Sequence, residues 1–160
     1  DLQTHLISTA LDWFGPAQVV SAQIRSIRGD SEDDVVLTLK HESGVDSYLS
    51  ASAIAGNPGP RIRLLGTEAA LVIEDLDPQE ALLRAGEFPE GGTWKVPTTS
   101  RAFIYKGDAK EEITGVPGNY GAFYLAVKAA LTDGAAWPIS QEEVLAVARI
   151  IDRAREINAR

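Results

Sequence analysis

The chain has 160 residues, of which 44% are hydrophobic and 24% charged, and its formal net charge is −8. This composition is typical of a globular domain with its own core, and no apolar run approaches the ~20 residues that span a membrane. The negative charge disfavours a nucleic-acid partner, which needs clustered Lys and Arg. With no cysteine and only two histidines, the chain has no thiol nucleophile, disulfide or zinc site. The lack of cysteine is compatible with a reducing compartment, and we expect a cytoplasmic protein.

The first 16 residues predict an amphipathic helix that ends at Gly15 and Pro16. Its apolar side chains recur at the spacing of one buried helix face: Leu2, Leu6, Ile7, Ala10, Leu11 and Phe14. Asp1 and His5 are four residues apart, so in a helix they share a face and can meet. A carboxylate near an imidazole stabilises the protonated ring and can fix its tautomer. This pair is the candidate acid–base site, and the alternative is a partly buried structural histidine hydrogen-bonded to Asp1.

Three strands are predicted next, over residues 18–28, 35–41 and 47–53. Their short connections favour antiparallel hairpins, because a parallel crossover needs a dozen or more residues. The acidic segment 29–34 between the first two strands lacks the alternating oxygen ligands of a calcium loop, so we expect a solvated turn. His41 ends the second strand beside Lys40, and we expect it to be exposed.

The second half predicts further short strands and then two helices. A strand–turn–strand pair covers residues 61–73, and late strands cover 101–105 and 111–114. Residues 80–84 suit either a short strand or a helical turn, and residues 86–100 are predicted to form a surface loop. One helix covers 120–132, and the last begins at Ser140 with Glu143 three residues on, which is a capping-box pattern. The predicted fold class is α+β, with helices packed on one face of a largely antiparallel open sheet. The other face must meet solvent, a partner chain or another domain.

Several short motifs, in order along the chain, resemble landmarks of one oxidoreductase family. They are Asp1-Leu2-x-x-His5-Leu6-Ile7 with Ala10-Leu11 and Phe14-Gly15-Pro16, then Gly66-Thr67-Glu68-Ala69-Ala70-Leu71, Asp77-Pro78-Gln79-Glu80, Pro117-Gly118-Asn119-Tyr120 with Phe123-Tyr124, and Pro138-Ile139-Ser140. This pattern resembles the C-terminal domain of the glucose–fructose oxidoreductase, inositol dehydrogenase and rhizopine-catabolism (Gfo/Idh/MocA) family. The resemblance covers nearly the whole chain and implies a dihydrodipicolinate-reductase-like C-terminal fold.

The resemblance implies that a partner domain exists in a longer parent protein. Family members pair this domain with an N-terminal Rossmann domain that binds NAD or NADP and carries a Glu-Lys-Pro motif. Neither feature occurs here, since no Gly-x-Gly-x-x-Gly follows a predicted strand. The chain also lacks an initiating Met and enters a helical pattern at once. We therefore expect a single substrate-binding and dimerisation domain over residues 1–160, with no dinucleotide bound by this chain alone.

The resemblance also assigns roles to individual residues. His5 would take the hydroxyl proton of a small-molecule sugar or polyol, and Asp1 would orient His5 and hold a substrate hydroxyl. Tyr120 would reach the same cleft, although packing at the start of a helix is the other interpretation of this side chain. Gln3 stands where the family usually has Gly, and Ser8 stands where it often has Asp. Gln3 would narrow the site or change its substrate.

Two functions of different class are therefore carried forward. The first is the substrate-binding and catalytic-base domain of an NAD(P)-dependent dehydrogenase. The second is a non-catalytic dimerisation or assembly domain that pairs open sheet faces, as family members do, so a homo-oligomer is expected. A ligand-binding role unrelated to redox chemistry is a third and weaker candidate. Neither a nucleic-acid nor a membrane partner is expected.

Overall fold

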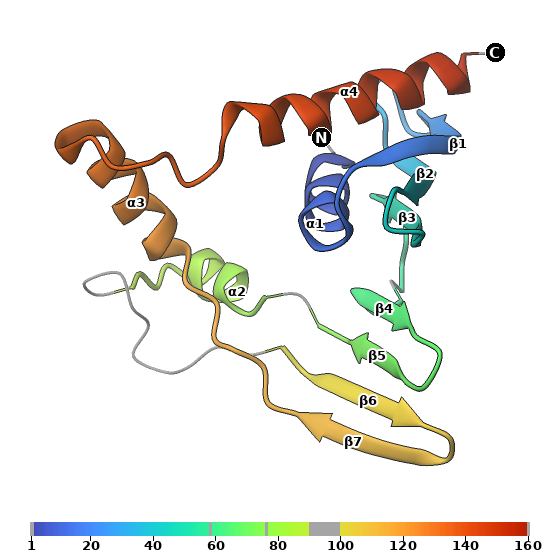
Figure 1. Cartoon of the computed structure of the whole chain (residues 1–160), viewed down its shortest axis with the longest axis horizontal. Helices are drawn as coiled ribbons and strands as arrows, with labels where there is room; N and C mark the ends of the chain where they lie inside the picture. The colour runs from blue at the N-terminus through green and yellow to red at the C-terminus, as the bar shows by residue number, and fades with distance from the viewer. Residues whose placement is uncertain (1, 58, 76, 90–99, 160) are drawn as a thin grey trace. The chain divides into compact units, whose positions relative to one another are not determined.

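The arrangement of helices and strands confirms an α+β protein with antiparallel sheets. The computed structural model describes residues 2–57, 59–75, 77–89 and 100–159. The described strands form two sheets, one of three strands and one of four, where the sequence suggested one open sheet. The chain divides accordingly into two compact units, Asp1–Gly56 with Ile139–Arg160, and Asn57–Pro138. Figure 1 labels the elements of both units.

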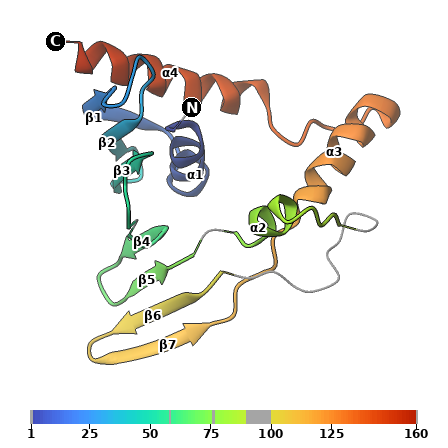
Figure 2. The ribbon, with the colours of Figure 1, turned by 180° about the vertical axis from the view of Figure 1, so that it is seen from behind.

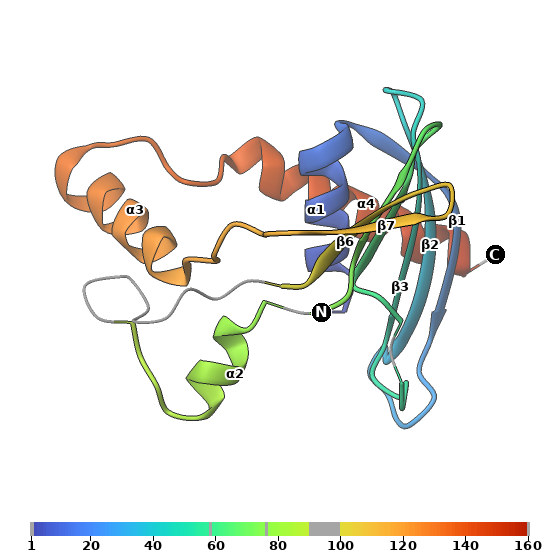
Figure 3. The same cartoon turned by 90° about the horizontal axis from the view of Figure 1, so that it is seen from below.

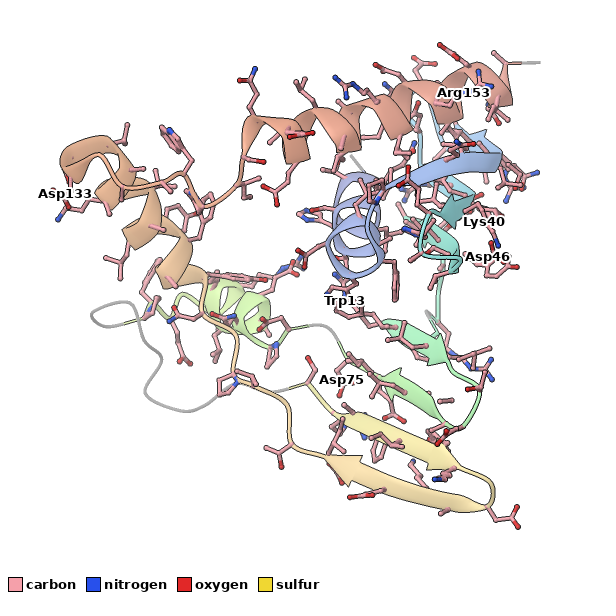
Figure 4. All side chains as sticks on the ribbon, viewed as in Figure 1. Trp13, Lys40, Asp46, Asp75, Asp133 and Arg153 are labelled. Atoms are coloured by element: carbon pink, nitrogen blue, oxygen red, sulfur yellow. The ribbon has the colours of Figure 1, made fainter. Side chains whose placement is uncertain are left out.

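The first unit contains a three-stranded meander and two helices. Its elements are α1 (Thr4–Phe14), β1 (Ala17–Arg25), β2 (Asp34–His41), β3 (Asp46–Ser52) and α4 (Gln141–Asn158). Neighbouring strands pair antiparallel in the order β1-β2-β3, as the short predicted connections required. Lys40 and Asp46 join the ends of β2 and β3 by an ion pair with 3.0 Å between Nζ and Oδ1. Figure 4 shows these two labelled side chains together at the end of the hairpin.

Alternation along β2 builds the core of this unit. Leu37 is 1% exposed, whereas the preceding Val36 is 43% exposed, because successive side chains point to opposite faces of a sheet. Buried residues from α1, β2 and α4 form a single cluster: Ile7, Ala10, Val35, Leu37, Leu39, Ile150 and Ala154. Both helices of the unit therefore cover the same sheet face. In Figure 3 this three-stranded sheet is seen edge-on, with α1 beside it.

Side chains at both ends hold α4 in place. At its start the predicted capping box is confirmed, since Ser140 Oγ accepts from the Glu143 amide at 3.2 Å and Glu143 Oε2 accepts from the Ser140 amide at 2.6 Å. Near its end Asn158 bonds both backbone groups of Ile24 on β1, accepting from the amide at 2.7 Å and donating to the carbonyl at 3.2 Å. Asn158 thus satisfies two backbone groups of an edge strand, which would otherwise be open to another chain.

The turn between β1 and β2 is built around a buried carboxylate, so the prediction of a solvated turn was wrong for Asp33 and Asp34, whereas residues 29–31 are exposed. Asp33 is 7% exposed. Its two oxygens accept hydrogen bonds from the backbone amides of Ile27 at 2.8 Å and Arg28 at 2.9 Å. These two amides hold the pKa of the Asp33 carboxyl below its ordinary value, because they stabilise the ionised form. The acidic residue therefore organises the loop, and this explains its position there.

The two neighbouring acidic residues also have partners. Asp34 is 8% exposed and accepts from Arg25 Nε at 2.8 Å and from Nη2 at 2.6 Å. Glu32 accepts from Arg155 of α4, Nε to Oε1 at 2.8 Å and Nη2 to Oε2 at 3.1 Å. The guanidinium hydrogen bonds lower the pKa of both carboxyls. The turn is thereby tied to β1 and to α4, segments that are far from each other in sequence.

The second unit contains a four-stranded antiparallel sheet and two helices. Its elements are β4 (Ile62–Leu65), β5 (Ala70–Ile73), α2 (Gln79–Arg84), β6 (Ala102–Lys106), β7 (Ala109–Ile113) and α3 (Tyr120–Asp133). The strand order is β4-β5-β6-β7, and Figure 2 shows β4 with β5 and β6 with β7 as hairpins, while α2 lies between β5 and β6 along the chain. The undecided segment 80–84 is helical, and residues 90–99 of the predicted surface loop are outside the described residues. In the part of the chain that the structure describes, no helix is long and apolar enough to cross a membrane.

Candidate active site

His5 lies in the first turn of α1 with its side chain exposed. The same helix buries Ile7 and Ala10 in the core of the first unit, so the helix is fixed while His5 remains open to solvent. A neutral imidazole has one ring nitrogen that can accept a proton or a hydrogen bond. Asp1, its predicted partner, is outside the described residues. The catalytic role of the pair therefore remains a prediction.

Gln3 is buried beneath the start of α1 and does not stand open beside His5. The residue is 3% exposed, and its Nε2 donates to Glu32 Oε2 at 3.4 Å. Its Oε1 has no hydrogen-bond partner among the described residues. The sequence suggested that this long side chain would narrow the site, but the pairing with Glu32 draws it inward. Ser8 is exposed one turn beyond Thr4 on the same helix.

His41, and not His5, is the buried structural histidine of this unit. It is 2% exposed, so the expectation of an exposed side chain was wrong. Its Nδ1 is 2.8 Å from the Gly15 carbonyl oxygen, and its Nε2 is 2.9 Å from Ser47 Oγ. The Phe14 ring meets the imidazole edge to face, with 5.5 Å between centroids. His41 therefore joins the end of α1 to the β2–β3 hairpin, and holds the helix that carries His5.

A sequence signal for this burial existed. Counting by twos along β2 from Val35 passes through Leu37 and Leu39 and arrives at His41, so the histidine shares the core face. The residue type misled the prediction, because histidine beside lysine at a strand end is more often exposed. In this chain a carbonyl and a hydroxyl satisfy both ring nitrogens, which removes the cost of burying them.

Tyr120 is the first residue of α3 in the second unit and is 42% exposed. Partial burial raises the pKa of its phenol above the ordinary value, and the negative charges of Asp77 and Glu80 add to this. The hydroxyl is therefore neutral at physiological pH and can both donate and accept a hydrogen bond. These properties suit contact with a substrate hydroxyl, which is the role that the sequence predicted.

Sequence reasoning named no role for Gln79, which the structure shows to be the anchor of Tyr120. Gln79 is fully buried at 0% exposure. Its Oε1 accepts from the Tyr120 amide at 2.9 Å, while its Nε2 donates to Asp77 Oδ2 at 2.8 Å. The signal that could have found this was the resemblance itself, since Gln79 and Tyr120 belong to two separate landmarks.

Two kinds of binding site, one for a metal ion and one for a dinucleotide phosphate, were sought among the described residues. No group of three or more His, Asp or Glu side chains in the described ranges could hold a metal. Gly56 and Gly59 are followed by strand β4, whereas a phosphate-binding glycine turn leads into a helix N-terminus. The segment with Gly56 and Gly59 therefore lacks the helix that follows the phosphate-binding turn of a Rossmann dinucleotide site.

Comparison with known proteins identifies the fold. A model of the oxidoreductase family, C-terminal alpha/beta domain, matches residues 1–158. The scyllo-inositol 2-dehydrogenase (NADP(+)) IolW of Bacillus subtilis is 31% identical over 98% of this chain, which covers 45% of that relative. A solved structure of yvaA from Bacillus subtilis superimposes with a TM-score of 0.81 at 30% identity, over 99% of this chain and 48% of the other. One from Klebsiella pneumoniae has a TM-score of 0.86 at 25% identity, over 99% and 46%.

The chain thus spans about half the length of the relatives it matches. The family match extends over nearly all of the chain, and the solved relatives share its fold over the same extent. The resemblance noted in the sequence is therefore confirmed, and this chain belongs to the Gfo/Idh/MocA family of oxidoreductases as a C-terminal alpha/beta domain.

Proposed function

We propose that this chain is the substrate-binding and catalytic-base domain of a longer, cytoplasmic NAD(P)-dependent oxidoreductase that acts on a sugar or polyol hydroxyl. The observation that carries the proposal is the exposed His5 on a helix whose opposite face is fixed in the core. The family match and the 31% identity to a scyllo-inositol 2-dehydrogenase support this reaction class.

In this mechanism His5 accepts the proton of the substrate hydroxyl that is oxidised to a carbonyl. Asp1 lies four residues before His5 in the sequence and ahead of the helix, which begins at Thr4. Its carboxylate would orient the imidazole and stabilise the protonated ring that forms when His5 accepts the proton. The neutral phenol of Tyr120 would hold a further substrate hydroxyl. A nicotinamide dinucleotide, bound by a separate domain of the longer protein, would supply the hydride acceptor.

The test is the substitution His5→Ala in the full-length protein. We expect turnover with the preferred polyol to fall about 100-fold or more, since general-base catalysis contributes about 10²–10⁴ in rate. Binding of NAD or NADP, measured by fluorescence titration, should be unchanged. Added imidazole should restore part of the lost turnover by entering the space left by the side chain. The matched control is Asp12→Ala, an exposed change further along α1. Unchanged turnover in His5→Ala would refute the catalytic role.

A second candidate function, self-association, has an observation of its own. Val36 and Tyr48 lie on the face of the β1–β3 sheet opposite the core and are 43% and 78% exposed. Two exposed apolar and aromatic side chains on a sheet face that otherwise carries polar residues, such as Thr38 and Ser50, would be the centre of a contact with a second chain. Pairing of two such faces would give a homodimer, and this role is compatible with catalysis. Sedimentation of the protein as a single chain at micromolar concentration would argue against it, and Tyr48→Glu should weaken a dimer that does form.

A further inference from the structure

Two landmarks that lie 41 residues apart meet at one buried side chain in the second unit. Gln79 donates its backbone amide to Asp77 Oδ1 at 2.9 Å and its Nε2 to Asp77 Oδ2 at 2.8 Å. Both carboxylate oxygens of Asp77 are thereby engaged by a single residue. The remaining amide oxygen of Gln79 accepts from the Tyr120 backbone amide at 2.9 Å. The orientation of the Gln79 amide is fixed, because only its oxygen can accept from Tyr120 and only its nitrogen can donate to a carboxylate.

The backbone of Gly118 packs directly on this pair. A Cβ atom at Gly118 would collide with Asp77 Oδ2 and with Gln79 Nε2. Both of those atoms are held by hydrogen bonds, and Gln79 is fully buried, so neither can move aside freely. The glycine is therefore required by close approach, and the turn before α3 can occupy a single position against Asp77 and Gln79.

Two side chains accept hydrogen bonds from the first backbone amides of α3, although a single N-cap side chain is enough to stabilise a helix start. The Asn119 side chain already caps the helix by accepting from the Ala122 amide at 3.0 Å. Gln79 supplies a second acceptor for the first amide of the helix, from outside the helix and from a buried position. A simple N-cap stabilises a helix but leaves its location free. The contact from Gln79 fixes where the Tyr120 backbone lies relative to α2.

We propose that Asp77 and Gln79 form a positioning pair that places the Tyr120 side chain for contact with the substrate. Asp77 orients the Gln79 amide, Gln79 holds the Tyr120 backbone, and Gly118 allows the close approach. This inference rests on the proposed function, because it assigns the purpose of the pair to substrate binding by Tyr120. It extends that proposal by naming residues that act on the substrate only through another residue.

The experiment compares Gln79→Ala, Tyr120→Phe and the double variant in the full-length protein. Loss of one substrate hydrogen bond in Tyr120→Phe should raise KM for the polyol about tenfold with kcat little changed, since a tenfold change is about 1.4 kcal/mol. Gln79→Ala should raise KM by a similar factor. The double variant should be no worse than Tyr120→Phe, because the pair acts through Tyr120. Gln79→Glu would place a second carboxylate beside Asp77 in a buried position, so it should raise KM at least as much as Gln79→Ala does. Gln23→Ala, an exposed change on β1, is the control.

Amide exchange tests the contact independently of turnover. In Gln79→Ala the Tyr120 amide should lose about tenfold or more of its protection, whereas the Ala122 amide, held by Asn119, should keep its protection. Unchanged protection at Tyr120 would overturn the inference even if the enzyme were active. Fully additive effects of Gln79→Ala and Tyr120→Phe on KM would also overturn it, by showing a structural role alone. Neither result would bear on the role of His5. Loss of turnover in His5→Ala would still support the proposed function.

Discussion

The buried His41 allows a sharp test of what holds α1, the helix that carries the candidate base. In His41→Ala the Gly15 carbonyl and Ser47 hydroxyl each lose a hydrogen bond of 2.8 or 2.9 Å, at about 1 kcal/mol each. The edge-to-face contact with Phe14 is also lost, at about 0.5–1.5 kcal/mol. We therefore expect the free energy of unfolding to fall by about 3 kcal/mol in total, as the sum of these contributions.

The assay is urea denaturation followed by circular dichroism. With a denaturant slope of about 1–3 kcal/mol per molar, the midpoint should fall by about 1–3 M. His5→Ala is the matched control, because this histidine lies on the same helix but is exposed, and its change should stay within about 0.5 kcal/mol. Ser47→Ala should lower the free energy of unfolding by less than His41→Ala does, and the two losses should not be fully additive in the double variant. Equal midpoints for His41→Ala and His5→Ala would refute the assignment of His41 as the structural histidine.

Two further predictions concern the first unit. Leu37→Ala should lower the free energy of unfolding by about 2–5 kcal/mol, because Leu37 is 1% exposed in the core. Val36→Ala, on the open face of the same strand, should lower it by less than about 1 kcal/mol. Similar losses in the two variants would contradict the assignment of the two sheet faces. The amides of Ile27 and Arg28 depress the pKa of Asp33 in the folded state. The ionised carboxylate therefore stabilises the fold fully above the ordinary pKa of an aspartate, and this stabilisation is lost as the pH falls through the lower pKa of the folded state. The stability difference between wild type and Asp33→Asn, measured by urea denaturation, should therefore shrink from about pH 6 to about pH 3, and a difference that grew on acidification would contradict the reasoning.

The sequence alone predicted most of the elements, because their signals are local. The stripe of apolar residues before Gly15 gave α1, and the capping box at Ser140 gave the start of α4. The alternation and short connections of residues 17–53 gave the antiparallel meander. The ordered landmarks gave the family, which the comparisons confirmed. Each of these patterns depends on neighbours within a few residues, where spacing and side-chain type suffice.

The tertiary structure decided what the polar residues do. Asp33 in a predicted solvated turn is buried by backbone amides, and His41 at a strand end is buried by a carbonyl and a hydroxyl. No local pattern marked Gln79 as an anchor for Tyr120, because its partner lies 41 residues away, and only the ordered family landmarks contained both residues. The sequence left open whether His5 is exposed or partly buried, and the structure shows it exposed on the helix that buries Ile7 and Ala10.

The physical reason for this division lies in the range of the interactions. Burial of an apolar side chain is non-directional, so a periodic pattern is enough to assign a face. Burial of a polar side chain is tolerated only where specific partners meet it at hydrogen-bond distance. Those partners come from segments such as α2 and the start of α3, or the end of α1 and the β2–β3 hairpin. Their meeting is a property of the folded chain, and it determines which histidine supports the fold and which remains free for chemistry.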